Sequence, residues 1–107
     1  MKLDNVGTVV ASRMLTILGD DKKKIMVLIG MPRPYLNTSD YYCPFQIQGV
    51  GSEAVEYAVG IDSAQALLLA LKRIPVLLLL LNKKLEGRLR WEGDESGDLG
   101  FPMEDGQ

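Results

Sequence analysis

The sequence predicts an α+β protein: a four-stranded antiparallel β-meander followed by a helical region packed on one face of the sheet. Three observations lead to this prediction. Residues 1–61 hold β-branched runs separated by turn residues, the apolar period lengthens from two to near four after residue 61, and leucine fills every position of Leu77–Leu81. The 107 residues suffice for a single domain, divided into a sheet region (1–61), a helical region (62–86) and an acidic C-terminal tail (87–107).

The first two strands are expected at Val6–Leu18 and Lys22–Met31, joined by a tight turn. In the first strand Arg13 falls among the apolar positions, which indicates a bulge or an edge position. The second strand contains the unbroken apolar run Ile25–Ile29, so we expect both of its faces to be covered, by the domain itself or on one side by a partner.

The third and fourth strands are expected at Tyr41–Val50 and Glu53–Val59. Pro44 lacks an N–H group, so the third strand should lie at an edge, at least locally. Alternation places Tyr41, Cys43, Phe45 and Ile47 on the inner face of the third strand. In the fourth strand it places Val55, Tyr57 and Val59 inward and Glu56 outward.

The helical region begins at Asp62, a good N-cap, with Gln65 three residues later in the spacing of a capping box. Pro75 should break or kink the helix, which predicts a Pro-kinked helix or a helical hairpin with parts at 62–74 and 75–85. Gly87 is the expected C-terminal stop. The inner apolar stripe of the first part is expected at Ala64, Leu67, Leu68, Leu71 and Ile74.

The leucine run predicts a helix that is apolar on all sides and must therefore be covered on all sides. The other helix, the tail or a second copy of the chain can supply the cover, and Leu78 and Leu80 are the candidate contacts of a homodimer. The uninterrupted apolar run Ile74–Leu81 has eight residues, against the roughly 20 that span a bilayer, so no membrane contact is expected.

Catalytic and metal chemistry have few candidate residues. The chain has no histidine and one cysteine, Cys43, which falls on an inner strand position and is expected to be a buried, inert thiol. We therefore expect no enzyme activity and no cofactor. Asp94, Glu95 and Asp98 do not match a calcium loop, so a metal is not expected there; a solvated turn, a partner contact and pairing with nearby arginines stay open.

Charge and cysteine usage limit the partners and the compartment. The formal net charge is −2 and the basic residues are scattered, which argues against nucleic acid. The absence of a signal-like segment and the lone cysteine favour a reducing cytoplasm. Residues 92–107 carry six acids and no base, so the tail is either solvated or folded onto a basic surface, of this chain or of a partner.

Two groups of residues are candidate partner or ligand contacts. Arg33, Tyr35 and Tyr42 surround the longest loop, and their residue types are frequent in binding hot spots. Anchoring of the loop is the alternative role for this group. Arg90 and Trp91 precede the acidic tail, where Trp91 either covers one end of the helical layer or faces a ligand.

Four segments together resemble a family of small, stand-alone bacterial proteins of unknown function. They are Tyr42–Gly49, Tyr57–Leu67, Leu89–Gly93 and Gly97–Pro102, and the resemblance covers about residues 41–102. The resemblance implies no catalytic residue. It does imply that Phe101 and Pro102 anchor the tail to the body of the protein.

These observations predict a non-catalytic protein-interaction module that self-associates or binds a protein partner, with an inhibitor or immunity-type role as one form. The alternative is a small-ligand-binding domain with a pocket between sheet and helices near Tyr57 and Trp91.

Overall fold

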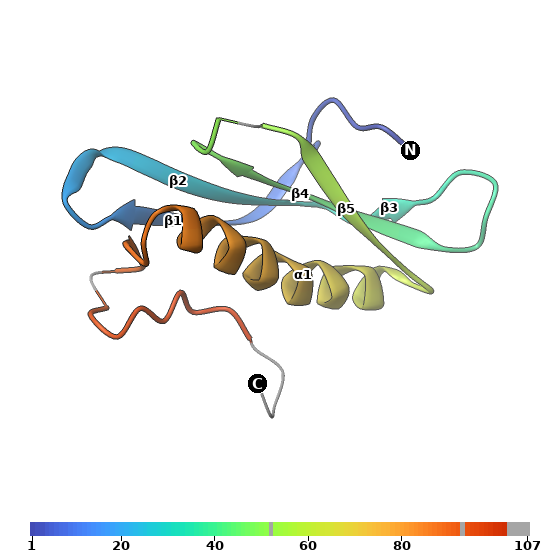
Figure 1. The fold of residues 1–107 in the computed structure, drawn as a ribbon. Helices are drawn as coiled ribbons and strands as arrows, with labels where there is room; N and C mark the ends of the chain where they lie inside the picture. Colours follow the sequence, from blue (N-terminus) through green and yellow to red (C-terminus); the bar gives the residue numbers. More distant parts are fainter. Residues whose placement is uncertain (52, 93, 103–107) are drawn as a thin grey trace.

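The computed structural model describes residues 1–51, 53–92 and 94–102, and it shows one antiparallel sheet with one α-helix packed on it (Figure 1). The α+β class is therefore as predicted. The strands are β1 (Val9–Ile17), β2 (Asp20–Gly30), β3 (Arg33–Pro34), β4 (Tyr41–Gln48), β5 (Val55–Gly60) and β6 (Leu89–Arg90), and the helix is α1 (Ser63–Lys84).

The sheet has six strands rather than the expected four. Its order is β6–β1–β2–β4–β5, with β3 beside β4 where β2 has ended. The four expected strands correspond to β1, β2, β4 and β5, and the two-residue strands β3 and β6 extend the sheet. Because β6 pairs only with Thr16 and Ile17, the rest of the outer edge of β1 has no strand of the described residues beside it.

Strand β4 is an interior strand, so the expected edge position was wrong. It pairs with β5 on one side and with both β2 and β3 on the other. Pro44 nevertheless lies where this second side is interrupted, between the β3 ladder at Tyr42 and the β2 ladder at Phe45. The sheet therefore accommodates a residue without an N–H group at a gap in its own ladder.

The inner face of β4 is as predicted, but that of β5 is shifted by one residue. Cys43 and Phe45 are buried on the α1 side, and their partners in β5 are Ala58 and Glu56. Residues paired across a ladder point to the same face, so Glu56 faces α1 and Tyr57 faces away. The fourth strand has apolar residues on both of its faces, so the pattern along the strand does not show which face is buried. Only the register of its pairing with β4 decides this.

Helix α1 is one continuous helix of 22 residues, so the prediction of a helical hairpin was wrong. Its N-terminus has the expected cap: Asp62 accepts a hydrogen bond from the backbone N–H of Gln65 at 2.8 Å, and the Gln65 side chain accepts one from Ile61 at 2.7 Å. Pro75 has no N–H group and so removes one intrahelical hydrogen bond. Its ring is buried, and the helix continues through it from Ile74 to Val76. Gly87, with φ of 76°, follows the helix end as expected.

The buried stripe of α1 also differs from the expected one. Its members recur every fourth residue and are Ala66, Ala70, Ile74 and Leu78, together with Pro75. The small side chains of Ala66 and Ala70 let the helix approach the sheet closely. Of the expected stripe only Ile74 is fully buried; Leu67 and Leu71 are half-buried, whereas Ala64 and Leu68 are exposed.

Candidate functional site

The aromatic and basic residues around the long loop do come together. The rings of Tyr35, Tyr42 and Tyr57 form a triangle of edge-to-face contacts with centroid separations of 6.1, 6.4 and 6.3 Å. Arg33 is the register partner of Tyr42, which places both on one face of the sheet. Tyr57 is the member that the sequence did not assign to this group, because its strand was placed one residue out of phase.

The three tyrosines of this cluster are half-buried. The N-terminal amino group of Met1 donates to the Tyr57 hydroxyl at 3.4 Å. Burial, followed by the charge and hydrogen bond of Tyr35, raises the pKa of Tyr57 above its ordinary value. The N-terminal residues that precede β1 pass beside Arg33 and Tyr42, with which they line a shallow hollow. The cluster therefore anchors the loop and the N-terminal segment on the sheet face opposite α1.

Trp91 is the centre of a second cluster, which attaches the C-terminal tail to the sheet. The guanidinium of Arg13 lies over the ring of Trp91 at 4.1 Å and over that of Phe101 at 4.7 Å, and it donates to the Leu99 carbonyl at 3.1 Å. Gly100 lies against the same ring: a Cβ there would be 2.4 Å from a Trp91 ring carbon. The expected anchoring by Phe101 is confirmed, and residues 103–107 lie outside the described residues.

Arg13 was not predicted as a site residue from the sequence, although a basic residue among the apolar positions of a strand indicates a special contact. The predicted bulge is present between Val9 and Ala11, but Arg13 still pairs with Val27 and shares its face of the sheet. A basic residue on an inner parity needs a partner that accepts a cation, and the only tryptophan of the chain supplies one.

Arg90 has a local structural role. Its Nη1 donates to the carbonyls of Gly87 and Leu89 at 2.8 and 2.7 Å, within the turn that follows α1. Arg88 makes similar bonds to Leu85 and Leu18. Both side chains thus bond carbonyl groups of the turn between α1 and β6, and Arg88 also ties this turn to the β1–β2 turn at Leu18.

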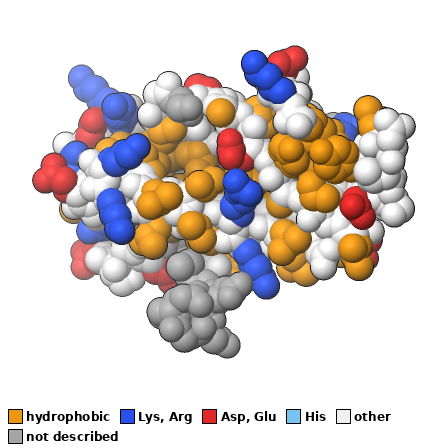
Figure 2. Space-filling model, turned by 45° about the vertical axis from the view of Figure 1, so that its right-hand side comes forward, with side chains coloured by type: hydrophobic (Ala, Val, Ile, Leu, Met, Phe, Trp, Pro, Cys, Tyr) orange, Lys and Arg blue, Asp and Glu red, His pale blue; other side chains and the backbone are white. Residues whose placement is uncertain are grey.

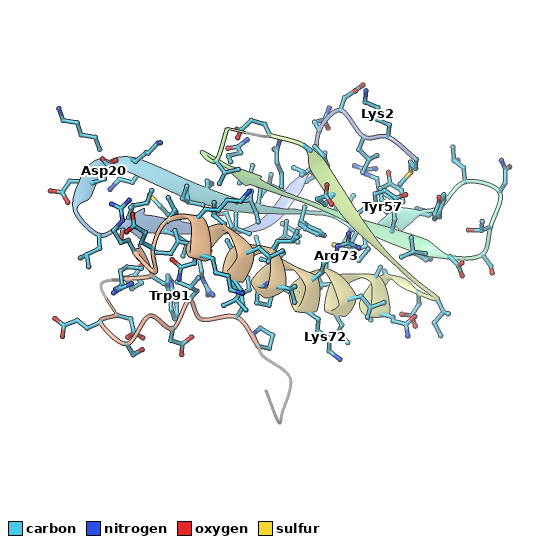
Figure 3. All side chains as sticks on the ribbon, in the orientation of Figure 1. Lys2, Asp20, Tyr57, Lys72, Arg73 and Trp91 are labelled. Carbon is cyan, nitrogen blue, oxygen red and sulfur yellow. The ribbon has the colours of Figure 1, made fainter. Side chains whose placement is uncertain are left out.

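The ligand pocket expected near Tyr57 and Trp91 does not form as one site. Figure 3 shows the two residues well apart, with Tyr57 near the N-terminal segment and Trp91 beside the tail. The register places Tyr57 on the face that points away from α1, whereas Trp91 packs against the core cluster that α1 covers.

The acidic residues of the tail build turns. Asp94 accepts hydrogen bonds from both the N–H and the hydroxyl of Ser96, at 2.8 and 2.6 Å, and Asp98 accepts from the N–H of Gly100 at 2.8 Å. The bonds from Ser96 lower the pKa of Asp94. Within the described part of the chain, no group of three His, Cys, Asp or Glu residues has the arrangement of a metal site.

The two leucines predicted as dimer contacts have different environments. Leu78 is fully buried and belongs to the core, so it is not available to a partner. Leu80 is 53% exposed. Cys43 is buried as expected, and burial raises the pKa of its thiol to about 11.

Around Leu80, α1 presents a surface that is apolar and basic. We call it the outer face of α1; its apolar members are each between 37% and 57% exposed and are Leu68, Leu69, Val76, Leu79 and Leu80. Lys72, Arg73, Lys83 and Lys84 are also exposed on this helix, and α1 contains no acidic residue. Figure 2 shows hydrophobic side chains gathered between Lys and Arg side chains on the face that comes forward.

By length and composition alone α1 is also long and apolar enough to cross a membrane, with a mean hydropathy of 1.9. The expectation that no segment reaches this length was therefore too strict. A single helix of this kind is weak support for a membrane span, since the core helix of a soluble protein has the same character. Here one side of α1 packs on β4 and β5.

The comparisons with known proteins identify a family and nothing beyond it. No curated protein and no solved structure matches this chain. One family model matches residues 11–103, from β1 to the docked tail. This confirms the resemblance to a family of unknown function, while a bacterial origin stays a prediction. The chain belongs to the family described as "Domain of unknown function (DUF6968)".

Proposed function

We propose that this protein is a non-catalytic interaction module that binds another protein through the outer face of α1. The observation that carries the proposal is the exposure of five large apolar side chains on one helix. A helix that only completes a core has a polar outer side, and an exposed apolar area of this kind is typical of a binding surface.

The charge of the helix indicates the chemistry of the partner. The basic residues of α1 have no acidic residue of the same helix among them. A partner surface that combines carboxylates with apolar side chains complements both properties. Charge complementarity of this kind speeds association and excludes partners of the wrong sign. An inhibitory or immunity-type role is one form that such a module takes, because it covers a surface of its target.

The residue types of the chain support a function without catalysis. The chain has no histidine, and its single thiol is buried with a pKa of about 11, so it is protonated at neutral pH. The three clustered tyrosines pack against one another and hold the loop. A free thiol also fits the cytoplasmic location, which stays a prediction.

Self-association is the second candidate, and the open edge of β1 favours it. From Val9 to Leu15 no strand in the described part of the chain lies beside the outer edge of this strand, and its exposed residues carry no charge. An antiparallel pair of such edges is self-complementary about a two-fold axis. Light scattering on the purified chain tests this candidate: a dimer that becomes a monomer in Met14→Lys supports it, and a wild-type monomer rules it out.

The main proposal is tested by site-specific crosslinking in cells. A photoreactive amino acid replaces Val76, which is 53% exposed on the outer face, and in the control it replaces Lys22, which is exposed on β2. We expect a protein to be captured from Val76 alone. After its identification and purification, its affinity should fall in Val76→Glu and stay unchanged in Lys22→Glu. Equal capture from both positions, or capture from neither, refutes the proposal.

A further inference from the structure

Among the described residues, no strand pairs with the outer edge of β5. β5 pairs with β4 alone, and no backbone hydrogen bond between described residues reaches its other side. Because alternate residues of a strand direct their N–H and C=O groups to opposite sides, this edge presents a row of donors and acceptors to solvent. Another extended backbone can replace water along such a row and pair with it.

One hollow follows this edge, and a second hollow adjoins it at Glu56 and lies between α1 and the end of β4. We call them together the β5–α1 groove. The first, of about 610 Å³, is lined by the five consecutive β5 residues Val55–Val59, by Leu69 and Arg73 of α1, and by Met1. The second, of about 280 Å³, shares Glu56 and continues beside Leu77, Leu80 and Lys84. Five consecutive strand residues line a hollow only if it follows the backbone edge, since one face would contribute every second residue.

We propose that the β5–α1 groove binds an extended segment of a partner protein, which adds to the sheet as a strand beside β5. The inference rests on the proposed interaction function and deepens it, because it specifies the kind of segment that the partner must supply. Main-chain hydrogen bonds to the edge provide affinity in this mode, and the side chains of the groove provide selectivity.

The groove selects acidic and apolar side chains on its α1 side. Glu56 and Ala58 face α1, so every second side chain of an added strand lies next to them and beside Leu69 and Arg73. Leu69 is 37% exposed and offers an apolar contact. The Arg73 side chain is 54% exposed and lies 3.7 Å from a Glu56 oxygen, so a carboxylate on the added strand shares its guanidinium or takes the place of Glu56.

The opposite side of the added strand meets a different set of residues. Val55, Tyr57 and Val59 point away from α1, and Val59 is 36% exposed. Figure 3 shows Tyr57 on β5 and Arg73 on α1 in the same part of the molecule, and both line the first hollow. The segment that fits has apolar residues on the side that points away from α1. On the side that faces α1 it has apolar residues together with a carboxylate.

The test selects random 12-residue peptides, displayed on phage, against the full chain. We expect the enriched peptides to alternate as described and to contain Asp or Glu. When a synthetic copy of an enriched peptide binds, hydrogen exchange should slow at alternate backbone amides of β5. N-methylation of single backbone amides of the peptide should abolish binding at every second position, where the N–H points toward β5, and should be tolerated at the positions between. Arg73→Gln should weaken the binding by about twofold to fivefold, and the matched variant Lys22→Gln should leave it unchanged.

The outcomes separate this inference from the proposed function. Enriched peptides that leave exchange at β5 unaltered overturn strand addition, as does tolerance of methylation on both parities. A library that yields no binding peptide overturns it as well. In each of these cases the crosslinking from Val76, which lines neither hollow, decides independently whether the outer face of α1 binds a protein.

Discussion

The attachment of the tail through Trp91 leads to a sharp prediction for Gly100→Ala. Gly100 has φ of 80°, and a Cβ there would lie 2.4 and 2.6 Å from two ring carbons of Trp91 and 2.7 Å from an Arg13 nitrogen. No side chain tolerates contacts of this length, so the ring or the tail must move. The matched control is Gly97→Ala, since Gly97 has φ of 88° but a Cβ at this residue would meet no other atom within 4 Å.

The two variants share one energetic term and differ in the other. An alanine in the left-handed region destabilises the folded state by about 1–2 kcal/mol in both variants. In Gly100→Ala the displaced ring also loses its contact with the Arg13 guanidinium, which contributes about 0.5–2 kcal/mol, and part of its packing. We therefore expect Gly97→Ala to lose about 1–2 kcal/mol of unfolding free energy and Gly100→Ala to lose roughly 2–4 kcal/mol.

The assay is urea unfolding followed by fluorescence, because Trp91 is the only tryptophan of the chain. Before unfolding, Gly100→Ala should show a red-shifted emission maximum and stronger quenching by acrylamide, whereas Gly97→Ala should emit like the wild type. Equal losses of stability with unaltered emission in both variants would refute the close packing of Gly100 on Trp91, and with it the docking of the tail at that point.

Three further predictions follow from burial and hydrogen bonding. Leu78→Ala should lose about 2–5 kcal/mol of unfolding free energy and Leu80→Ala less than about 0.5 kcal/mol, as measured by urea unfolding; similar losses would contradict their different burial. The Cys43 pKa is raised from 9.0 to about 11 in the folded protein. The unfolded chain therefore loses its thiol proton first, and this thiol should lower stability between pH 9 and 11 by about 1.4 kcal/mol per pH unit at most. The fall should be steeper in the wild type than in Cys43→Ala, in which the raised pKa of Tyr57 still acts in the same direction. Asp94 has a lowered pKa in the folded protein, so its contribution to stability is present at neutral pH and is lost as the pH falls through that folded value. In Ser96→Ala the backbone N–H bond remains but the hydroxyl bond is lost, so the Asp94 pKa, followed by carboxyl NMR shifts, should move part of the way toward its ordinary value; an unchanged pKa would exclude the Ser96 hydroxyl as a cause.

Local signals in the sequence predicted local structure well. The Asp62 cap with its Gln65 partner, the Gly87 stop and the inner face at Cys43 and Phe45 each depend on residues close in the chain, and all three are confirmed. The tail anchor at Phe101 was implied by the family resemblance, and it is confirmed as well.

The errors arose where a distant contact decides between two locally equal arrangements. Strand β5 carries apolar residues on both parities, and only its pairing with β4 brings Glu56 to the α1 side and Tyr57 to the other. In the same way, Pro44 is tolerated in an interior strand because β2 and β3 leave a gap beside it. Neither the phase nor the gap is encoded in the residues of the strand itself.

The helix shows most directly how the candidate surface departs from what folding requires. Of the nine leucines between Ser63 and Lys84, only Leu78 is fully buried, whereas the small side chains of Ala66 and Ala70 supply buried contacts of the core. Polar residues at Leu68, Leu79 or Leu80 would leave those buried contacts intact. Stability therefore does not account for exposed leucines between basic residues, whereas the protein-binding surface that we propose would account for them.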